Sequence, residues 1–420
     1  MKTFLPRDAQ NRLQPIYSVC SSHRLVIKAA LEMAALSGDI ALIEATCNQV
    51  NQFGGYTGMQ AVDFHDFVKA IAAEIPAARF SLGGDHLGPN PWRDLPSAEA
   101  MKYAEEMVAS YVAAGFHKIH LDASMPCADD PEILSDATIA ERAARLCVAA
   151  EAIAITDQLP IYVIGTEVPK PGGVVGSVDE VHATTAEAAA AALASHKKAW
   201  QAAGLSSSWH RVVALVVQPG VEFSDDAVAF YDSQNAKPLS HWLAGSQEDI
   251  VFEAHSTDYQ PASALTALVQ DDFRILKVGP GLTFALREVL YALDAIARVL
   301  LPKSTRKRLP CVLEEVMLEK PVHWIAYYGE TPSAPVKRHF SYSDRIRYYW
   351  TEPDVIHAVE ELFSELSETE IPETVVSQYL PDVYPQLRKG KKISADLLID
   401  LKLHRVLSLY ATACTVGKVT

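Results

Sequence analysis

The 420-residue chain has little cysteine, and its six cysteines form no CxxC motif and no close pair. In a chain of this length such scattered residues indicate free thiols in a reducing compartment. The N-terminal stretch MKTFLPRDAQNRLQ lacks the apolar run of a signal peptide, and no apolar run reaches membrane-spanning length. We therefore expect a cytoplasmic protein that does not associate with a membrane.

Positive charge is also scarce, since 37 Lys and Arg stand against 52 Asp and Glu, giving a net charge of −15. This balance argues against nucleic acid as a partner, because neutralising its phosphates needs clustered Lys and Arg. A small phosphorylated ligand remains compatible, because backbone N–H groups and one or two cations suffice to hold it. The sequence contains no GxxxxGK[ST] loop, which disfavours a kinase that binds nucleotide in this way.

The first ~300 residues alternate short apolar runs with Ala-rich stretches, a pattern typical of parallel strands buried on both faces and joined by helices. A doubly wound sheet is the alternative, but it calls for a Gly-rich turn after the first strand, where SVCSSH stands. We predict an α/β fold, a (β/α)8 TIM barrel over residues 1–300, with a helical C-terminal extension over 301–420 packed on it. The expected strands are 16–20, 40–46, 79–84, 118–123, 161–167, 212–218, 250–255 and 274–279.

Catalytic groups of such barrels project from the carboxyl ends of the strands. The third expected strand ends in GGDHLGPN, which contains Asp85 and His86. Imidazole can bind a divalent metal, and a neighbouring carboxylate can move a proton at the same centre. The alternative is a turn in which Asp85 caps the next helix and His86 lies on the surface.

Other strand ends also carry polar groups. Asp122 ends the fourth, Glu167 the fifth, and Glu253 and His255 the seventh, where a spacing of two places both on one side. The catalytic candidates are thus Asp85, Glu167, Asp122 and Glu253, and the metal-ligand candidates are His86, His255 and Glu167. Asp122 bonded to a loop backbone and His255 as a satisfied core residue remain alternatives.

Several loops suit a hydroxyl-rich, phosphorylated ligand. Amides and glycines follow the second strand, PKPGG follows the fifth, and GPG follows the eighth, where barrels often bind phosphate. An Arg in the aromatic segment 340–350 could hold an anion, or this segment could serve packing alone. The binding candidates are Asn48, Gln52, Gly54, Gly55, Gly172, Gly173, Ser256, Lys277, Gly279, Gly281 and Arg345.

Long motifs over nearly the whole chain, IEATCNQVNQFGGYTGM, SLGGDHLGPNPW, HLDAS, GTEVPKPGG, FEAHSTDYQ, KVGPGLTFALRE and YSDRIRYYW, resemble the GatZ/KbaZ family. These are Z-type subunits of tagatose-1,6-bisphosphate aldolase, some of them labelled tagatose-6-phosphate kinases. The resemblance implies a TIM barrel related to class II aldolases and a role in galactitol or N-acetylgalactosamine breakdown. It also implies a non-catalytic partner that supports the activity and stability of a Y-type class II subunit, hence an oligomeric state.

The resemblance further suggests zinc, with His86 and His255 as ligands and Asp85 as proton carrier. No HG pair stands near residues 214–220, where Gln218 and Pro219 occur instead, so Glu167 is the candidate third ligand. The competing hypothesis is an autonomous metal-dependent ketose-phosphate 4-epimerase or aldolase.

Overall fold

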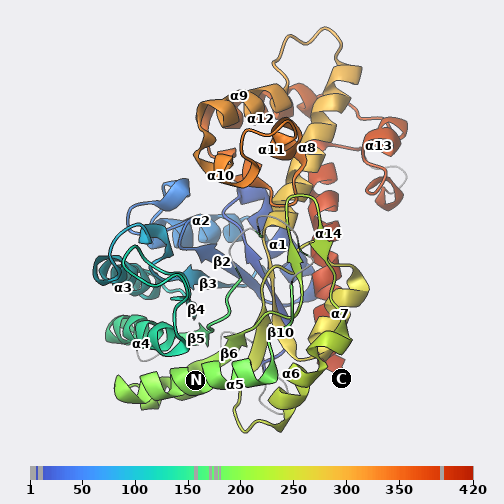
Figure 1. Cartoon of the computed structure of the whole chain (residues 1–420). Helices are drawn as coiled ribbons and strands as arrows, with labels where there is room; N and C mark the ends of the chain where they lie inside the picture. Colours follow the sequence, from blue (N-terminus) through green and yellow to red (C-terminus); the bar gives the residue numbers. More distant parts are fainter. Residues whose placement is uncertain are drawn as a thin grey trace.

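Eight parallel strands close into a barrel in the computed structural model, which describes residues 6–7, 13–155, 159–169, 173–174, 178, 181–387 and 392–419 (Figure 1). Around the barrel their order is β1-β10-β9-β6-β5-β4-β3-β2, so the first and last strands of the barrel pair with each other. The strands are β1 (Ile16–Cys20), β2 (Ala41–Thr46), β3 (Phe80–Leu87), β4 (Lys118–Leu121), β5 (Ile161–Ile164), β6 (Val212–Val216), β9 (Val251–Ala254) and β10 (Phe273–Val278).

These are the eight predicted strands, and the predicted (β/α)8 barrel is confirmed. Their residues are buried almost throughout, because helices cover the outside and side chains fill the inside. Two boundaries matter for the site: β3 runs three residues beyond its predicted end, and β5 ends three residues earlier than predicted.

Helices α1 to α8 cover the outside of the barrel. The helices that follow the third and fifth strands are each followed by a glycine with positive φ, Gly115 and Gly204. The helices are α1 (Arg24–Ser37), α2 (Ala61–Ala73), α3 (Ser97–Ala113), α4 (Asp136–Ile153), α5 (Ala186–Ala202), α6 (Ser233–Gly245), α7 (Ala262–Gln270) and α8 (Pro280–Leu300). A short hairpin, β7 (Glu222–Phe223) and β8 (Val228–Ala229), lies between β6 and α6.

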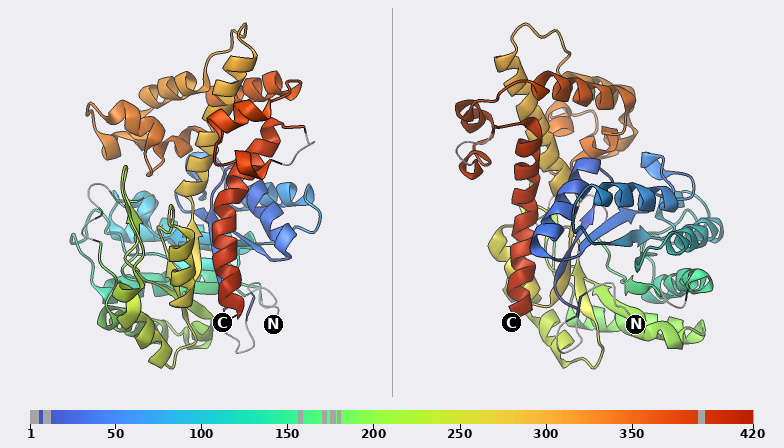
Figure 2. Two further views of the ribbon diagram at one scale, coloured as in Figure 1. Left: turned by 90° about the vertical axis from the view of Figure 1, so that its right-hand side faces the viewer. Right: turned by 180° about the vertical axis from the view of Figure 1, so that it is seen from behind.

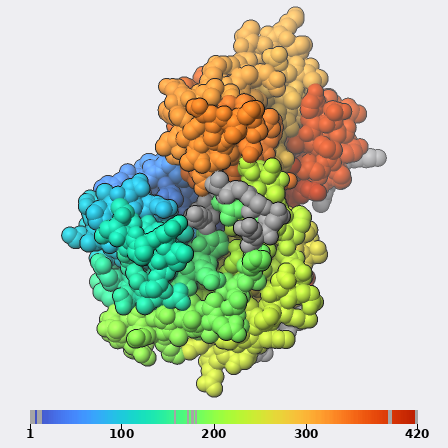
Figure 3. All heavy atoms as spheres, viewed as in Figure 1, coloured from blue at the N-terminus to red at the C-terminus, as the bar shows by residue number. Residues whose placement is uncertain are grey.

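The described residues after α8 contain helices and loops but no strand. The helices are α9 (Leu309–Glu319), α10 (Ile325–Tyr328), α11 (Ala334–Phe340), α12 (Pro353–Ser367), α13 (Glu373–Tyr379) and α14 (Ala395–Val419). Among them lies the 3-10 helix η5 (Arg345–Tyr349). Helices α9 to α12 stand beyond the end of the barrel, and in Figure 3 their orange atoms rest against the blue residues of the first barrel units.

Helix α14 returns along the outside of the barrel beside α7 and α8 (Figure 2). Its Tyr410 hydroxyl donates to the carbonyl of Thr257 at 2.7 Å, and Lys28 of α1 pairs with Asp400 at 3.0 Å. The last helix therefore belongs to the outer layer of the barrel. Within the described residues, every helix is too short or too polar to cross a membrane.

Candidate functional site

A bulge near the end of β3 brings two neighbouring polar side chains into the barrel. Between Gly84 and Leu87 the strand advances three residues while its partner β4 advances two, from Ile119 to Leu121. The extra residue lets successive side chains point inward, and bulges of this kind are common beside active sites. His86 adopts φ 49°, which is unusual for a residue other than glycine. Asp85 and His86 are consequently both buried, each 3% exposed.

Carboxylates hold two of the histidines at this end of the barrel. His86 Nδ1 lies 2.8 Å from Asp122 Oδ2, and His120 Nδ1 lies 3.1 Å from Asp85 Oδ1. A carboxylate accepts hydrogen bonds, so the contact with Asp122 favours a proton on His86 Nδ1. His120 Nδ1 faces both the Asp85 carboxylate and the backbone N–H of His86, which donates to it at 3.2 Å. The Nε2 atom of His120 is buried and has no hydrogen-bond partner, which makes it an available ligand atom.

The third histidine, His255, is also held by a carboxylate, but through Nε2 instead of Nδ1. His255 Nε2 lies 3.0 Å from Glu253 Oε1, and burial lowers the pKa of His255 to about 3, so its ring is neutral at pH 7. The ring centres of His86, His120 and His255 lie 4.7, 5.1 and 5.2 Å apart. Three imidazoles that bind one zinc ion at about 2.1 Å have ring centres roughly 5 Å apart. Carboxylates that hold the far nitrogens of histidines are typical of the surroundings of a bound metal.

Two lysines inside the barrel neutralise part of the negative charge. Lys118 lies 2.7 Å from both Glu44 and Glu253, and all three are fully buried. Lys277 pairs with Glu44 and lies 2.9 Å from Asp85. Burial alone would raise the pKa of Asp85, but the charges of His86 and Lys277 hold it well below its ordinary value.

The buried carboxylates of the site outnumber its buried ammonium groups. The carboxylates of Glu44, Asp85, Asp122 and Glu253 face the ammonium groups of Lys118 and Lys277. Burial alone would lower the pKa of His86, but Asp85 and Asp122 raise it, so its ring adds positive charge. The four carboxylates still outnumber the cationic groups. Unbalanced negative charge is costly inside a barrel of low polarity, and a bound cation would offset it.

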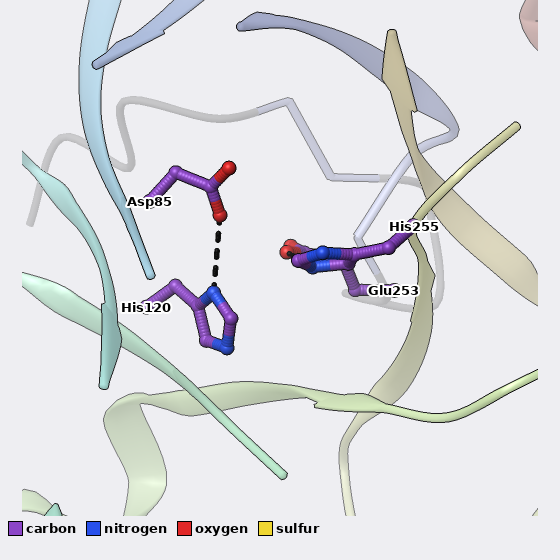
Figure 4. A group of neighbouring side chains, drawn as sticks. All are labelled: Asp85, His120, Glu253 and His255. Carbon is purple, nitrogen blue, oxygen red and sulfur yellow. Dashed lines mark hydrogen bonds and ion pairs between the residues drawn. The ribbon is translucent and has the colours of Figure 1, made fainter. Parts of the chain in front are cut away.

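Four side chains offer ligand atoms that all lie within 4.8 Å of one another: Asp85, His120, Glu253 and His255. Figure 4 shows them converging from β3, β4 and β9, with the ring of His120 directed toward that of His255. The unpartnered Nε2 of His120 and the excess negative charge both fit a cation. These residues form a candidate metal-binding cluster.

A cleft opens above this cluster at the carboxyl ends of the strands. It reaches the cluster through Asp85, His86 and His255, and its other walls come from the loops after β2 and β10, the β7–β8 hairpin and η5. Its further lining residues include Cys20, Thr46, Asn48, Gln49, Tyr56, Phe223, Ser256, Asp258, Lys277, Gly279, Arg347 and Tyr348.

The chain is similar to known proteins over its whole length. A sequence model of the D-tagatose-1,6-bisphosphate aldolase subunit GatZ/KbaZ-like family matches residues 1–415. The chain belongs to this family. The GatZ subunit of D-tagatose-1,6-bisphosphate aldolase from Klebsiella pneumoniae is 49% identical, with 99% of both chains covered. The GatZ subunit from Salmonella dublin is 48% identical over the same shares.

One solved structure shares this fold closely. The crystal structure of a probable tagatose 6 phosphate kinase from Sinorhizobium meliloti 1021 matches with a TM-score of 0.88 and 49% identity, covering 96% of this chain and 100% of that one. A protein named as a probable kinase therefore shares this barrel.

The structure brings many of the predicted site residues of this family member together. Asn48, Asp85, His86, His255, Ser256, Lys277 and Gly279 line the cleft. Asp122 and Glu253 lie behind the cleft, where each holds a histidine. Gly281 borders the cleft through its N–H, which donates to Asp258 Oδ1 at 2.7 Å.

Other predicted residues lie elsewhere. Glu167 is exposed, and its Oε2 accepts a hydrogen bond from Thr184 at 2.6 Å, so the structure does not bring it to the histidines. The reason is the early end of β5 at Ile164, after which the chain no longer follows the barrel wall. Arg345 is buried and donates to the carbonyl of His323 at 2.6 Å, outside the cleft.

The glycine-rich loop after β2 also has a structural explanation. Gln52 donates to the carbonyl of Tyr103 at 3.0 Å, and the N–H of Gly55 donates to Asn51. A Cβ on Gly55 would lie 2.4 Å from the carbonyl of Gln49, so glycine is required for packing there. Gly54, with φ 98°, closes the same turn.

The structure describes only part of the PKPGG loop that follows β5. Gly172 lies outside the described residues. Gly173 has φ 85°, and a Cβ there would lie 2.5 Å from the carbonyl of Phe223 in the hairpin. The described end of this loop therefore packs closely on a residue that lines the cleft.

Reasoning from the sequence missed His120, although the sequence holds a signal for it. In KIHLD, Lys118, His120 and Asp122 occupy alternate positions of an otherwise apolar strand, so all three face the barrel interior. Glu44 in β2 likewise interrupts a buried apolar run. Polar residues at inward positions were the detectable sign of this ionic interior.

Proposed function

We propose that this chain is a Z-type subunit that assembles with a Y-type class II aldolase subunit and binds a phosphorylated ketose, D-tagatose 1,6-bisphosphate or its 6-phosphate, in the cleft. Similarity to GatZ subunits over 99% of the chain supports the role as a subunit. The single observation that carries ligand binding is the meeting of three carboxylate-held histidines at the base of one cleft, which His86 and His255 line. A scaffold subunit without a ligand would have no use for this arrangement. The corresponding setting is galactitol or N-acetylgalactosamine catabolism in the cytoplasm.

We further propose that the cluster holds zinc through His120 and His255, with His86, Asp85 and Glu253 as the neighbouring donors. A divalent cation bound there would polarise a carbonyl or hydroxyl oxygen of the sugar. Asp85 is held ionised and lines the cleft, so its carboxylate can accept the proton of a sugar hydroxyl. Asp122 and Glu253 position the imidazoles rather than touch the ligand.

The structure offers no support for phosphoryl transfer from a nucleotide. The chain has no phosphate-binding GxxxxGK[ST] loop. We therefore do not propose kinase activity for this chain.

The test combines the purified chain with a Y-type subunit and follows cleavage of D-tagatose 1,6-bisphosphate. We expect no cleavage by this chain alone and faster cleavage by the mixture than by the Y-type subunit alone. We also expect the mixture to resist thermal inactivation, because binding at 100 times the dissociation constant stabilises a folded partner by about 2.7 kcal/mol. Heat-denatured chain at the same concentration is the control.

Two results would overturn this proposal. A mixture that behaves as the Y-type subunit alone would remove the partner role. Turnover of ketose phosphates by this chain alone, lost in His86→Ala, would instead establish an autonomous enzyme.

A further inference from the structure

The cleft at the barrel end continues into a second cavity beside the helical extension. The first cavity, next to the histidines, has a volume of only about 80 Å³. The second has about 390 Å³ and shares Cys20, Gln49, Tyr56, Gly279 and Arg347 with the first. Pockets for drug-sized ligands usually span roughly 300 to 1,000 Å³, so most of a sugar bisphosphate would have to lie in the second cavity.

The backbone nest predicted to bind phosphate is already filled by the chain itself. The N–H groups of Gly279 and Gly281, at the start of α8, donate to Oδ1 of Asp258 at 2.9 and 2.7 Å. Asp258 is buried, 3% exposed, and its carboxylate takes the place of an external anion. A phosphate in this cleft therefore needs a different partner.

Arg347 is placed to be that partner. It comes from η5 of the extension, is half-buried, and lies where the two cavities meet. Its guanidinium donates to the carbonyls of Ser343 and Asp344 at 2.5 and 2.9 Å and to the hydroxyl of Tyr348 at 3.1 Å. These partners are neutral, and they fix the group in one orientation. Arginine has five N–H donors, so two remain for a ligand.

Neighbouring groups complete a site for an anion. Tyr56 lines both cavities, and its ring lies 4.6 Å from that of Tyr348. Arg24 also lines the second cavity, where its guanidinium is paired with Glu74 at 2.6 Å. Arginine held in a fixed orientation beside hydroxyl groups binds phosphate through paired, charge-assisted hydrogen bonds.

The neighbouring arginine, Arg345, is not placed to bind a phosphate in the cleft. Its guanidinium packs 3.8 Å from the ring centre of Tyr327 and 4.5 Å from that of Tyr348, and Arg345 lines neither of the two cavities. It supports Tyr348 by packing, whereas Arg347 faces the cleft.

We infer that Arg347, with the hydroxyl groups of Tyr56 and Tyr348, binds a phosphate group of the sugar phosphate where the two cavities meet. The helical extension thus supplies the anion-binding side chain that the barrel loop, closed by Asp258, does not. This inference rests on the proposed function, because it assumes a phosphorylated ligand in the same cleft.

Calorimetric titration of the full-length chain with D-tagatose 1,6-bisphosphate, inorganic phosphate and unphosphorylated D-tagatose tests this inference. Arg347→Gln is expected to weaken bisphosphate binding about 10-fold to 100-fold, the usual range for a charge-assisted hydrogen bond. Inorganic phosphate should weaken in parallel and D-tagatose should be unaffected. Arg347→Lys keeps the charge but loses the paired donors, so its loss should be intermediate.

The matched control is Arg298→Gln, which removes the same charge from an exposed position of α8 outside the cleft and should leave all affinities unchanged. Bisphosphate binding by Arg347→Gln at the native affinity would overturn the inference, as would a native chain that binds no phosphorylated ligand. If Arg347→Gln does not fold, native affinity in Arg347→Lys together with tighter binding in Asp258→Ala would assign the phosphate to the α8 nest instead. A chain that activates the Y-type subunit and binds the bisphosphate equally well with and without Arg347 would refute this inference alone.

Discussion

Replacing Lys118 by methionine is expected to lower the free energy of unfolding by about 3–5 kcal/mol at pH 7. Lys118 is fully buried and lies 2.7 Å from Glu44 and from Glu253. Removing its ammonium leaves Glu44 and Glu253 with Lys277 as their shared cation, 3.9 Å from Glu253, and a buried charge that has lost a partner is among the costliest defects. Denaturant unfolding followed by far-ultraviolet circular dichroism measures the loss.

A second substitution separates charge from packing. Adding Glu44→Gln to Lys118→Met removes one of the two carboxylates that Lys118 pairs with in the native chain. Part of the lost stability should therefore return. Lys303→Met, at an exposed position, is the matched control and should change stability by less than about 0.5 kcal/mol. A Lys118→Met variant as stable as this control would contradict a buried ionic network that depends on Lys118.

Gly88→Ala is expected to cost about 3 kcal/mol of stability and to weaken the site as well, because overpacking against backbone cannot be relieved by a side-chain rotation. An added Cβ would lie 1.6 Å from the carbonyl oxygen of Asp122. The N–H of Asp122 donates to the carbonyl of Leu87 at 3.0 Å, so these two segments are already tied together. The alanine variant must separate them and draw Asp122 away from His86.

The readouts for Gly88→Ala are unfolding by denaturant and the nuclear magnetic resonance signals of the His86 ring. Gly245→Ala is the control, since a Cβ there meets nothing within 4 Å and alanine favours a helix by roughly 0.5–1 kcal/mol. Equal stabilities for the two variants would show that β3 and β4 do not approach each other in the way described.

The strands were predictable because each is a continuous apolar run, which a strand buried on both faces requires. The helices followed from Ala-rich stretches that end near Gly115 and Gly204. The bulge at Asp85 and His86 was not predictable in this way, because it depends on the register between β3 and β4. The sequence therefore indicated these two residues but not how both could face inward.

Where the site prediction departs from the structure, the cause is local geometry. The fifth strand was predicted to extend to Glu167, yet its pairing with β6 ends at Ile164, so Glu167 lies beyond the strand and is exposed. In the 3-10 helix η5, with three residues per turn, Arg345 and Arg347 face different directions. Periodicity in the sequence could not decide which arginine faces the cleft.

Asp122 and Glu253 were predicted to be catalytic, whereas in the structure each holds a histidine. Asp258 closes the start of α8. Burial raises the pKa of Asp258 to about 6 even though two N–H groups donate to it. Such roles depend on contacts between segments far apart in the chain, so they emerge only once the barrel has closed.

The central claim is that carboxylate-held histidines at the barrel mouth bind a divalent cation, and equilibrium zinc binding to the chelator-treated chain tests it most directly. We expect the native chain to bind one zinc ion. Binding should be about 100-fold weaker in His120→Ala or His255→Ala, since four ligands share roughly 10–16 kcal/mol in structural zinc sites. The double variant should show no specific zinc binding. His357→Ala, whose side chain is 73% exposed, should bind as the native chain does. A native chain that takes up no zinc, or a double variant that binds it as tightly as the native chain, would contradict the account.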